Sequence, residues 1–82
     1  MRMPEHVTGA WMDSLTDSDL LTAESRLHKA FSALERAQKK LLGDGYSLMR
    51  GPAELLAAWG SWSRVSTEAR VRRLHVSRAR TA

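Results

Sequence analysis

Hydrophobic residues recur every seven positions through the first half of the chain. Four leucines keep this interval, and a series of alanines runs beside them: Leu20, Leu27, Leu34 and Leu41, with Ala23, Ala30 and Ala37. A seven-residue apolar repeat keeps one stripe of a helix facing a single partner, and alanine beside leucine allows that partner to approach closely. The pattern therefore predicts one long helix over about residues 17–42 that lies against another helix.

Capping signals mark both ends of this predicted helix. Thr16 is the expected N-cap, and Asp19 three residues later forms a shortened capping box with it. At the other end, Lys39 and Lys40 suit the negative end of the helix dipole. Gly43 then suits the position after the helix, which favours a left-handed backbone.

A second amphipathic segment follows a connection of nine residues, 43–51. Pro52 suits the first position of a helix because its missing N–H is not needed there. Leu55, Trp59 and Trp62 share one side of this second helix, which is expected over about residues 52–69.

The two ends of the chain lack such a pattern. Residues 1–15 contain Pro4 and Gly9 and have no clear period, which predicts a loose N-terminal arm whose Val7, Trp11 and Met12 are available to dock on a helix. From Arg70 the apolar period fades, so residues 70–82 are predicted to be an arginine-rich tail that is a fraying helix or disordered.

Two long amphipathic helices with a short connection predict an all-α fold, a helical hairpin. A lone hairpin buries a single seam, and a chain of 82 residues without cysteine has no disulfide to support a small core. We therefore expect two hairpins to dimerise into a four-helix arrangement. The predicted interface residues are Leu20, Leu27, Phe31, Leu34 and Leu41.

The net charge of +4 conceals a gradient along the chain. Residues 13–24 contain four acidic residues and no Lys or Arg, whereas residues 64–80 contain six arginines against one glutamate. The acidic start and the basic end could meet in an antiparallel arrangement. The same gradient is typical of a basic tail that seeks an anionic partner.

This tail supports an alternative function, in which the protein is a nucleic-acid-binding regulator. The candidate contacts are Arg70, Arg72, Arg73, Arg78 and Arg80. Arginine binds phosphate in a salt-dependent and sequence-independent way. These arginines do not line one helix face, however, and no aromatic residues are interleaved with them. A tail that only keeps the chain soluble fits the pattern equally well.

Candidate catalytic chemistry is sparse. His28 has Glu24 one turn before it, which fits either a base with its orienting group or, much more commonly, a surface pair flanking the apolar stripe. A metal site needs three or four converging ligands, and the chain has no cysteine and no HExxH spacing. We expect no enzymatic activity, no metal and no cofactor.

Trp59 and Trp62 lie one turn apart on the apolar side of the second helix. Tryptophan is enriched at interface hot spots, but it is also an ordinary core residue, and the sequence leaves both roles open. The predicted contacts to a partner protein are Trp59, Trp62, Tyr46 and Met49.

The segment Trp59-Gly60-Ser61-Trp62-Ser63-Arg64 is similar to a WGxW segment in some phage antitermination proteins of the Q type. This resemblance covers six residues of 82 and implies a phage or mobile-element origin, without carrying a function across.

Together these patterns predict a small non-enzymatic helical regulator, an inhibitor or adaptor that binds a larger protein as a homodimer. No apolar run approaches the length of a membrane span, and the N-terminus lacks the apolar region of a signal peptide. We therefore expect a cytoplasmic protein.

Overall fold

The computed structural model of the protein describes residues 3–48 and 51–74, and these residues form helices without any strand. In chain order the elements are α1 (Gly9–Asp13), α2 (Asp17–Leu42), the 3-10 turn η1 (Gly43–Gly45) and α3 (Ala53–Val71). The predicted all-α class is confirmed. A hairpin that dimerises into a four-helix arrangement stays a prediction.

Helix α2 begins and ends at the residues whose chemistry favours those ends. The backbone N–H of Asp19 donates to the Thr16 hydroxyl over 3.1 Å, which satisfies one of the free N–H groups of the first turn. Gly43 ends the helix with φ at +55°, a backbone conformation that residues with a Cβ rarely adopt. With 26 residues, α2 is about 39 Å long at the usual helical rise.

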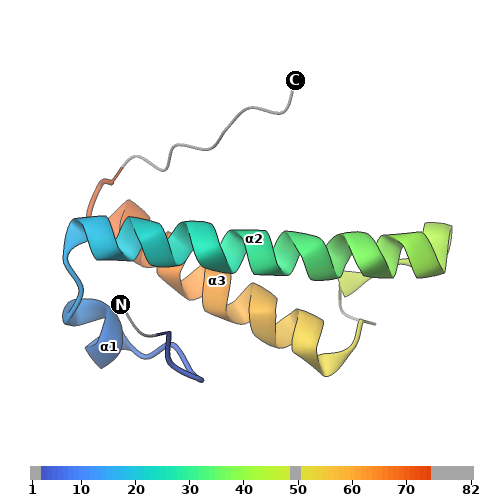
Figure 1. The fold of residues 1–82 in the computed structure, drawn as a ribbon, viewed down its shortest axis with the longest axis horizontal. Helices are drawn as coiled ribbons and strands as arrows, with labels where there is room; N and C mark the ends of the chain where they lie inside the picture. The colour runs from blue at the N-terminus through green and yellow to red at the C-terminus, as the bar shows by residue number, and fades with distance from the viewer. Residues whose placement is uncertain (1–2, 49–50, 75–82) are drawn as a thin grey trace.

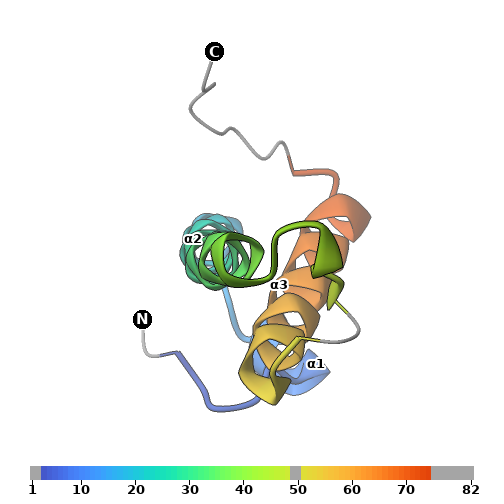
Figure 2. The same ribbon diagram turned by 90° about the vertical axis from the view of Figure 1, so that its right-hand side faces the viewer.

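Helix α3 returns obliquely along the N-terminal half of α2, in the opposite direction (Figures 1 and 2). The far end of α2 extends beyond the start of α3 (Figure 1). At that start, the chain turns closely at Gly51, where an added Cβ would lie 2.6 Å from Cδ2 of Leu55. Any larger residue here would have to displace the buried Leu55 side chain, which occupies the space next to Gly51.

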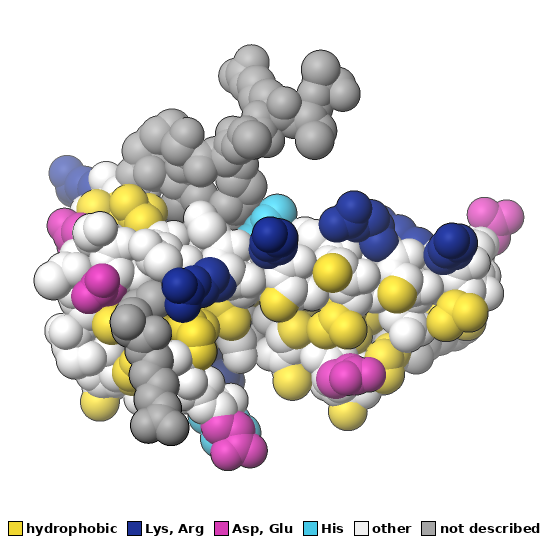
Figure 3. Space-filling model, viewed as in Figure 1, with side chains coloured by type: hydrophobic (Ala, Val, Ile, Leu, Met, Phe, Trp, Pro, Cys, Tyr) yellow, Lys and Arg dark blue, Asp and Glu magenta, His cyan; other side chains and the backbone are white. Residues whose placement is uncertain are grey.

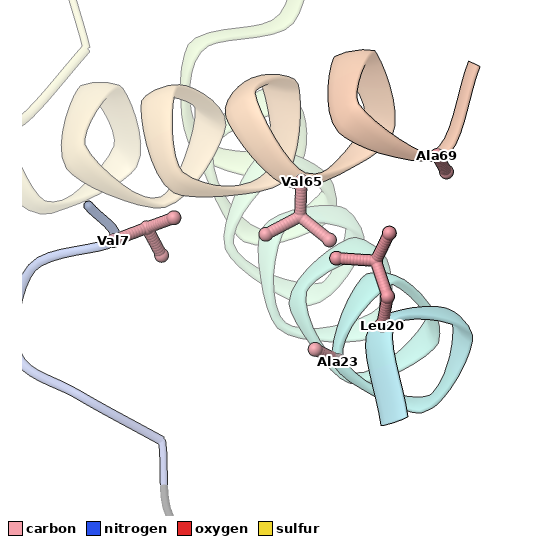
Figure 4. Packing of buried hydrophobic residues seen from close by; sticks show 5 residues of the cluster. All are labelled: Val7, Leu20, Ala23, Val65 and Ala69. Atoms are coloured by element: carbon pink, nitrogen blue, oxygen red, sulfur yellow. The ribbon is translucent and has the colours of Figure 1, made fainter. Parts of the chain in front are cut away.

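The core is small and lies where α3, α2 and the N-terminal segment meet. Its buried hydrophobic residues, drawn in Figure 4, are Val7, Leu20, Ala23, Val65 and Ala69. Partly buried residues surround them: Met3, Trp11, Met12, Leu15, Leu27 and Leu74. Because the first residue of this core comes from the N-terminal segment, that segment is part of the folded unit.

The segment 1–15, expected to be a loose arm, docks on the helices through Val7, Trp11 and Met12 as its sequence allowed, and it also contains a short helix that its composition did not indicate. Val7 is 5% exposed, and α1 follows it directly. Thr8 caps this short helix, since its hydroxyl accepts a hydrogen bond of 3.1 Å from the Trp11 backbone N–H. A helix of five residues is too short to show a hydrophobic period, which explains why the sequence pattern missed it.

Helix α3 ends in a Schellman motif. The N–H of Leu74 donates to the carbonyl of Ala69, and the N–H of Arg73 donates to that of Arg70, each over 2.9 Å. Arg73 adopts the left-handed conformation that the motif requires, with φ at +59°. Leu74 then packs against the core. Residues 70–74 are therefore held in defined positions at the end of α3, whereas the fading apolar period predicted fraying from Arg70.

Candidate protein-interaction surfaces

The leucine and alanine face of α2 is divided into two halves with different surroundings. In the N-terminal half, Leu20 and Ala23 are fully buried, and Leu27 is partly buried against the core. In the C-terminal half, Ala30 and Ala37 are exposed, and Leu41 is 78% exposed. Figure 3 shows hydrophobic side chains along the part of α2 that extends away from α1. We use the name open face for the apolar residues of this C-terminal half: the exposed Ala30, Ala37 and Leu41, and the half-buried Leu34.

The division follows from the lengths of the elements. Helix α3 and the N-terminal segment pack on the first half of α2, and no described element covers the open face as they cover the first half. Of the five predicted interface residues, Leu20 and Phe31 are buried within the chain. These two cannot contact a second copy unless the fold opens. Leu34 is half-buried and Leu41 is exposed, so both stay available.

Trp62 packs inside the chain between α2 and α3. Its ring stacks on Phe31 at a centroid distance of 5.5 Å and meets His28 edge-on at 5.0 Å. Its indole N–H donates to Oε1 of Glu24 over 2.8 Å, and Glu24 is fully buried. The prediction of a surface pair of Glu24 and His28 is therefore wrong. Glu24 points inward because α3 crosses α2 at this level and supplies the indole donor.

Trp59, one turn earlier on α3, has a different environment. Its side chain is 42% exposed, although tryptophan is usually among the more buried residues. The two tryptophans that share one side of the helix in the sequence are thus separated by the fold: Trp62 is a packing residue, and Trp59 is a surface aromatic residue.

Tyr46, in the connection that follows α2, folds back and contacts this helix. Its hydroxyl donates to Oε2 of Glu35 over 2.8 Å. Lys39 forms an ion pair of 3.7 Å with Glu35, and its ammonium lies 5.4 Å from the centre of the Tyr46 ring. Tyr46 is half-buried in this arrangement, and the other predicted contact of this connection, Met49, lies outside the described residues.

This arrangement raises the pKa of Tyr46 above its ordinary value, chiefly through burial of the phenol and further through the hydrogen bond and the negative charge of Glu35. The neutral phenol is therefore favoured by folding. Its contribution to stability is present below the ordinary pKa of about 10 and is lost as the pH rises through the folded value.

We expect an alkaline titration of the tyrosinate absorbance to show this raised midpoint, because Tyr46 is the only tyrosine in the chain. Glu35→Gln should lower the midpoint, and Glu35→Ala should lower it further by also removing the acceptor. Both should stay above the value in the urea-unfolded protein because burial remains. A native midpoint equal to the unfolded one would contradict the assignment.

Arg72 connects the end of α3 to the turn between α1 and α2. Its guanidinium donates to the carbonyls of Met12 and Leu15 over 2.8 and 3.0 Å. It also forms ion pairs with Asp17 at 3.1 Å and Glu68 at 2.9 Å. The hydrogen bond to Glu68 is the main cause that raises the pKa of Arg72, although desolvation opposes it. The predicted meeting of the acidic start and the basic end occurs here.

The arginines considered for nucleic-acid contact are therefore not equivalent. The guanidinium of Arg72 is held by acceptors of its own chain, and its side chain is only 20% exposed, which leaves it less available to an external phosphate than an exposed arginine. Arg70 and Arg73 are exposed. Arg78 and Arg80 lie outside the described residues.

Residues 3–48 and 51–74 contain no group of three or more His, Asp or Glu side chains placed to hold a metal ion. Among the helices of the same residues, none combines the length and the apolar character that crossing a membrane requires.

Comparisons with protein-family models, with curated proteins and with solved structures find no match to this chain.

Proposed function

We propose that the protein is a small, non-enzymatic helical regulator that acts by binding a larger protein, as an inhibitor or adaptor, and that it does so as a homodimer. The observation that supports this most is the open face of α2, where the leucine and alanine repeat continues beyond the elements that cover its first half. Leu41, at the end of this repeat, is 78% exposed. Apolar surface of this kind on a small domain is typical of an interaction site.

Trp59 supplies a second surface, and we assign it to the larger partner. An exposed tryptophan offers a large, rigid contact area, and such residues commonly supply much of the binding energy of a protein interface. Trp62 is excluded from this role because its ring and its N–H are already engaged within the chain. The short segment that resembles a phage protein therefore lies in α3 with one tryptophan directed to the core and one exposed.

The proposal is tested by identifying a protein that the tagged chain captures, purifying it, and titrating it by calorimetry. We expect Trp59→Ala to weaken binding about 30-fold or more, as for a central interface residue. Val71→Ala is the matched control, since Val71 is also on α3 and is 71% exposed. Saturable binding that both variants leave unchanged would contradict the role of Trp59. The absence of any partner that binds with defined stoichiometry would contradict the function.

Nucleic-acid binding is the second candidate function. It is supported by the exposure of Arg70 and Arg73 at the end of α3, beside the arginines that follow in the sequence. The internal role of Arg72 removes one contact from the set. Duplex DNA added to the purified protein at low salt distinguishes the two candidates, because retention that falls steeply with salt is expected only of the second.

A further inference from the structure

We propose that the open face of α2 is the binding site for the same face of a second copy, with the two helices antiparallel and in one defined register. In this register Leu34 of one copy faces Ala37 of the other, and Leu41 faces Ala30. The inference deepens the homodimer part of the proposed function and rests on it, but it requires no larger partner.

The alternation of side-chain size favours this orientation. Two parallel helices in register would place leucine against leucine and alanine against alanine, so that wide and narrow layers alternate along the seam. The antiparallel arrangement places a leucine opposite an alanine in every layer, which keeps the helix separation constant and allows close packing. A two-fold axis then makes each contact occur twice, as in most homodimers.

Residues that are already buried fix the register. Ala23 is fully buried in the core and is unavailable to another chain, so the seam must lie in the C-terminal half of α2. The register that uses only Ala30, Leu34, Ala37 and Leu41 overlaps the helices over residues 29–42. This overlap is about 21 Å long. Such a short seam predicts a weak, reversible dimer rather than an obligate one.

Charges beside the seam select the same register. Arg26 is exposed on α2 and, in the proposed arrangement, is level with Gly45 of the other copy, next to the exposed Asp44. A shift of one heptad toward the N-terminus would instead bring Arg26 close to Lys40 of the other copy. Arg26 therefore faces an opposite charge in the proposed register and a like charge in its neighbour.

The first test is sedimentation equilibrium of the full chain from micromolar to millimolar concentration. We expect a monomer–dimer equilibrium that Ala37→Glu weakens at least about 100-fold, because it places a charge in the apolar seam. Ala57→Glu is the control, since Ala57 is exposed on α3. Circular dichroism checks that both variants keep their helices. A native chain that is monomeric at every concentration, or a dimer that both variants weaken equally, would overturn the proposal.

The second test examines register and orientation. The chain has no cysteine, so each introduced cysteine reports one position. A mixture of Ala30→Cys and Leu41→Cys should cross-link with a short thiol reagent, whereas either variant alone should not. In the antiparallel dimer two copies of position 30 are about 16 Å apart along the helix. Cross-linking of Ala30→Cys to itself, or none in the mixture, would exclude the register.

A third test exchanges the charges of Arg26 and Asp44, which the proposed register brings close together. Arg26→Asp and Asp44→Arg should each weaken the dimer, and the double variant should restore most of the loss. A double variant that is weaker than either single one would contradict the predicted pairing.

If the dimer tests fail while a purified larger partner still binds through Trp59, only the homodimer site is lost. Loss of partner binding with an intact dimer would instead remove the larger part of the proposed function.

Discussion

Leu20→Ala is expected to leave most of the protein unfolded in water, whereas Leu41→Ala should leave the folded chain nearly unchanged. The two leucines occupy the same position of the heptad repeat, but Leu20 is fully buried and Leu41 is 78% exposed. Removing a buried leucine costs about 2–5 kcal/mol through lost apolar burial and the cavity left behind. A core of this size rarely supplies more than about 3–5 kcal/mol in total.

Urea unfolding followed by circular dichroism at low protein concentration measures both variants. Low concentration matters because self-association would add stability to the native chain that Leu41→Ala lacks. Helix propensity does not confound the comparison, since alanine is at least as good a helix former as leucine. We expect the free energy of unfolding of Leu41→Ala to lie within about 0.5 kcal/mol of the native value. Equal losses at both positions would show that the end of α2 is covered by its own chain.

The heptad repeat predicted the helix over residues 17–42 but not its division into a covered and an open half. A heptad repeat predicts which face of a helix is apolar, but it does not predict which other segments of the chain cover that face. The division depends on where α3 starts and on the placement of Val7, which is far from α3 in the sequence. Leu20 and Leu41 are therefore equivalent in the sequence and different in the fold.

The contacts of Arg72 were beyond sequence analysis for a related reason. Glu68 one turn before it predicts only the i,i+4 ion pair. Its other main acceptors, at Met12 and Leu15, are backbone carbonyls about 60 positions away in the chain. Every residue has a backbone carbonyl, so the sequence does not show which carbonyls will accept hydrogen bonds from Arg72. The charge gradient did indicate that the two ends could meet, as Arg72 and Asp17 do, because net charge is a property of whole segments.

Trp62→Ala is expected to destabilise the chain strongly, and Trp59→Ala is expected to have little effect on stability. Trp62 stacks on Phe31 and donates its indole N–H to the fully buried Glu24, so its removal leaves a cavity and takes a donor from a buried carboxylate. Such truncations cost about 3 kcal/mol or more. Trp59 is 42% exposed and has no comparable packing to lose.

Trp62→Phe separates the two parts of this loss. Phenylalanine keeps an aromatic ring against Phe31 but cannot donate to Glu24, so we expect a loss of about 1–3 kcal/mol because the buried carboxyl oxygen loses its indole donor. Glu24→Gln is the complementary variant, because it keeps an oxygen acceptor for the indole and replaces the ionisable carboxyl group by an amide. Adding Glu24→Gln should lessen the loss that Trp62→Phe causes, since the two groups are coupled. Strictly additive losses in urea unfolding would contradict this coupling, and Trp62 would then stabilise the junction of α2 and α3 by packing alone.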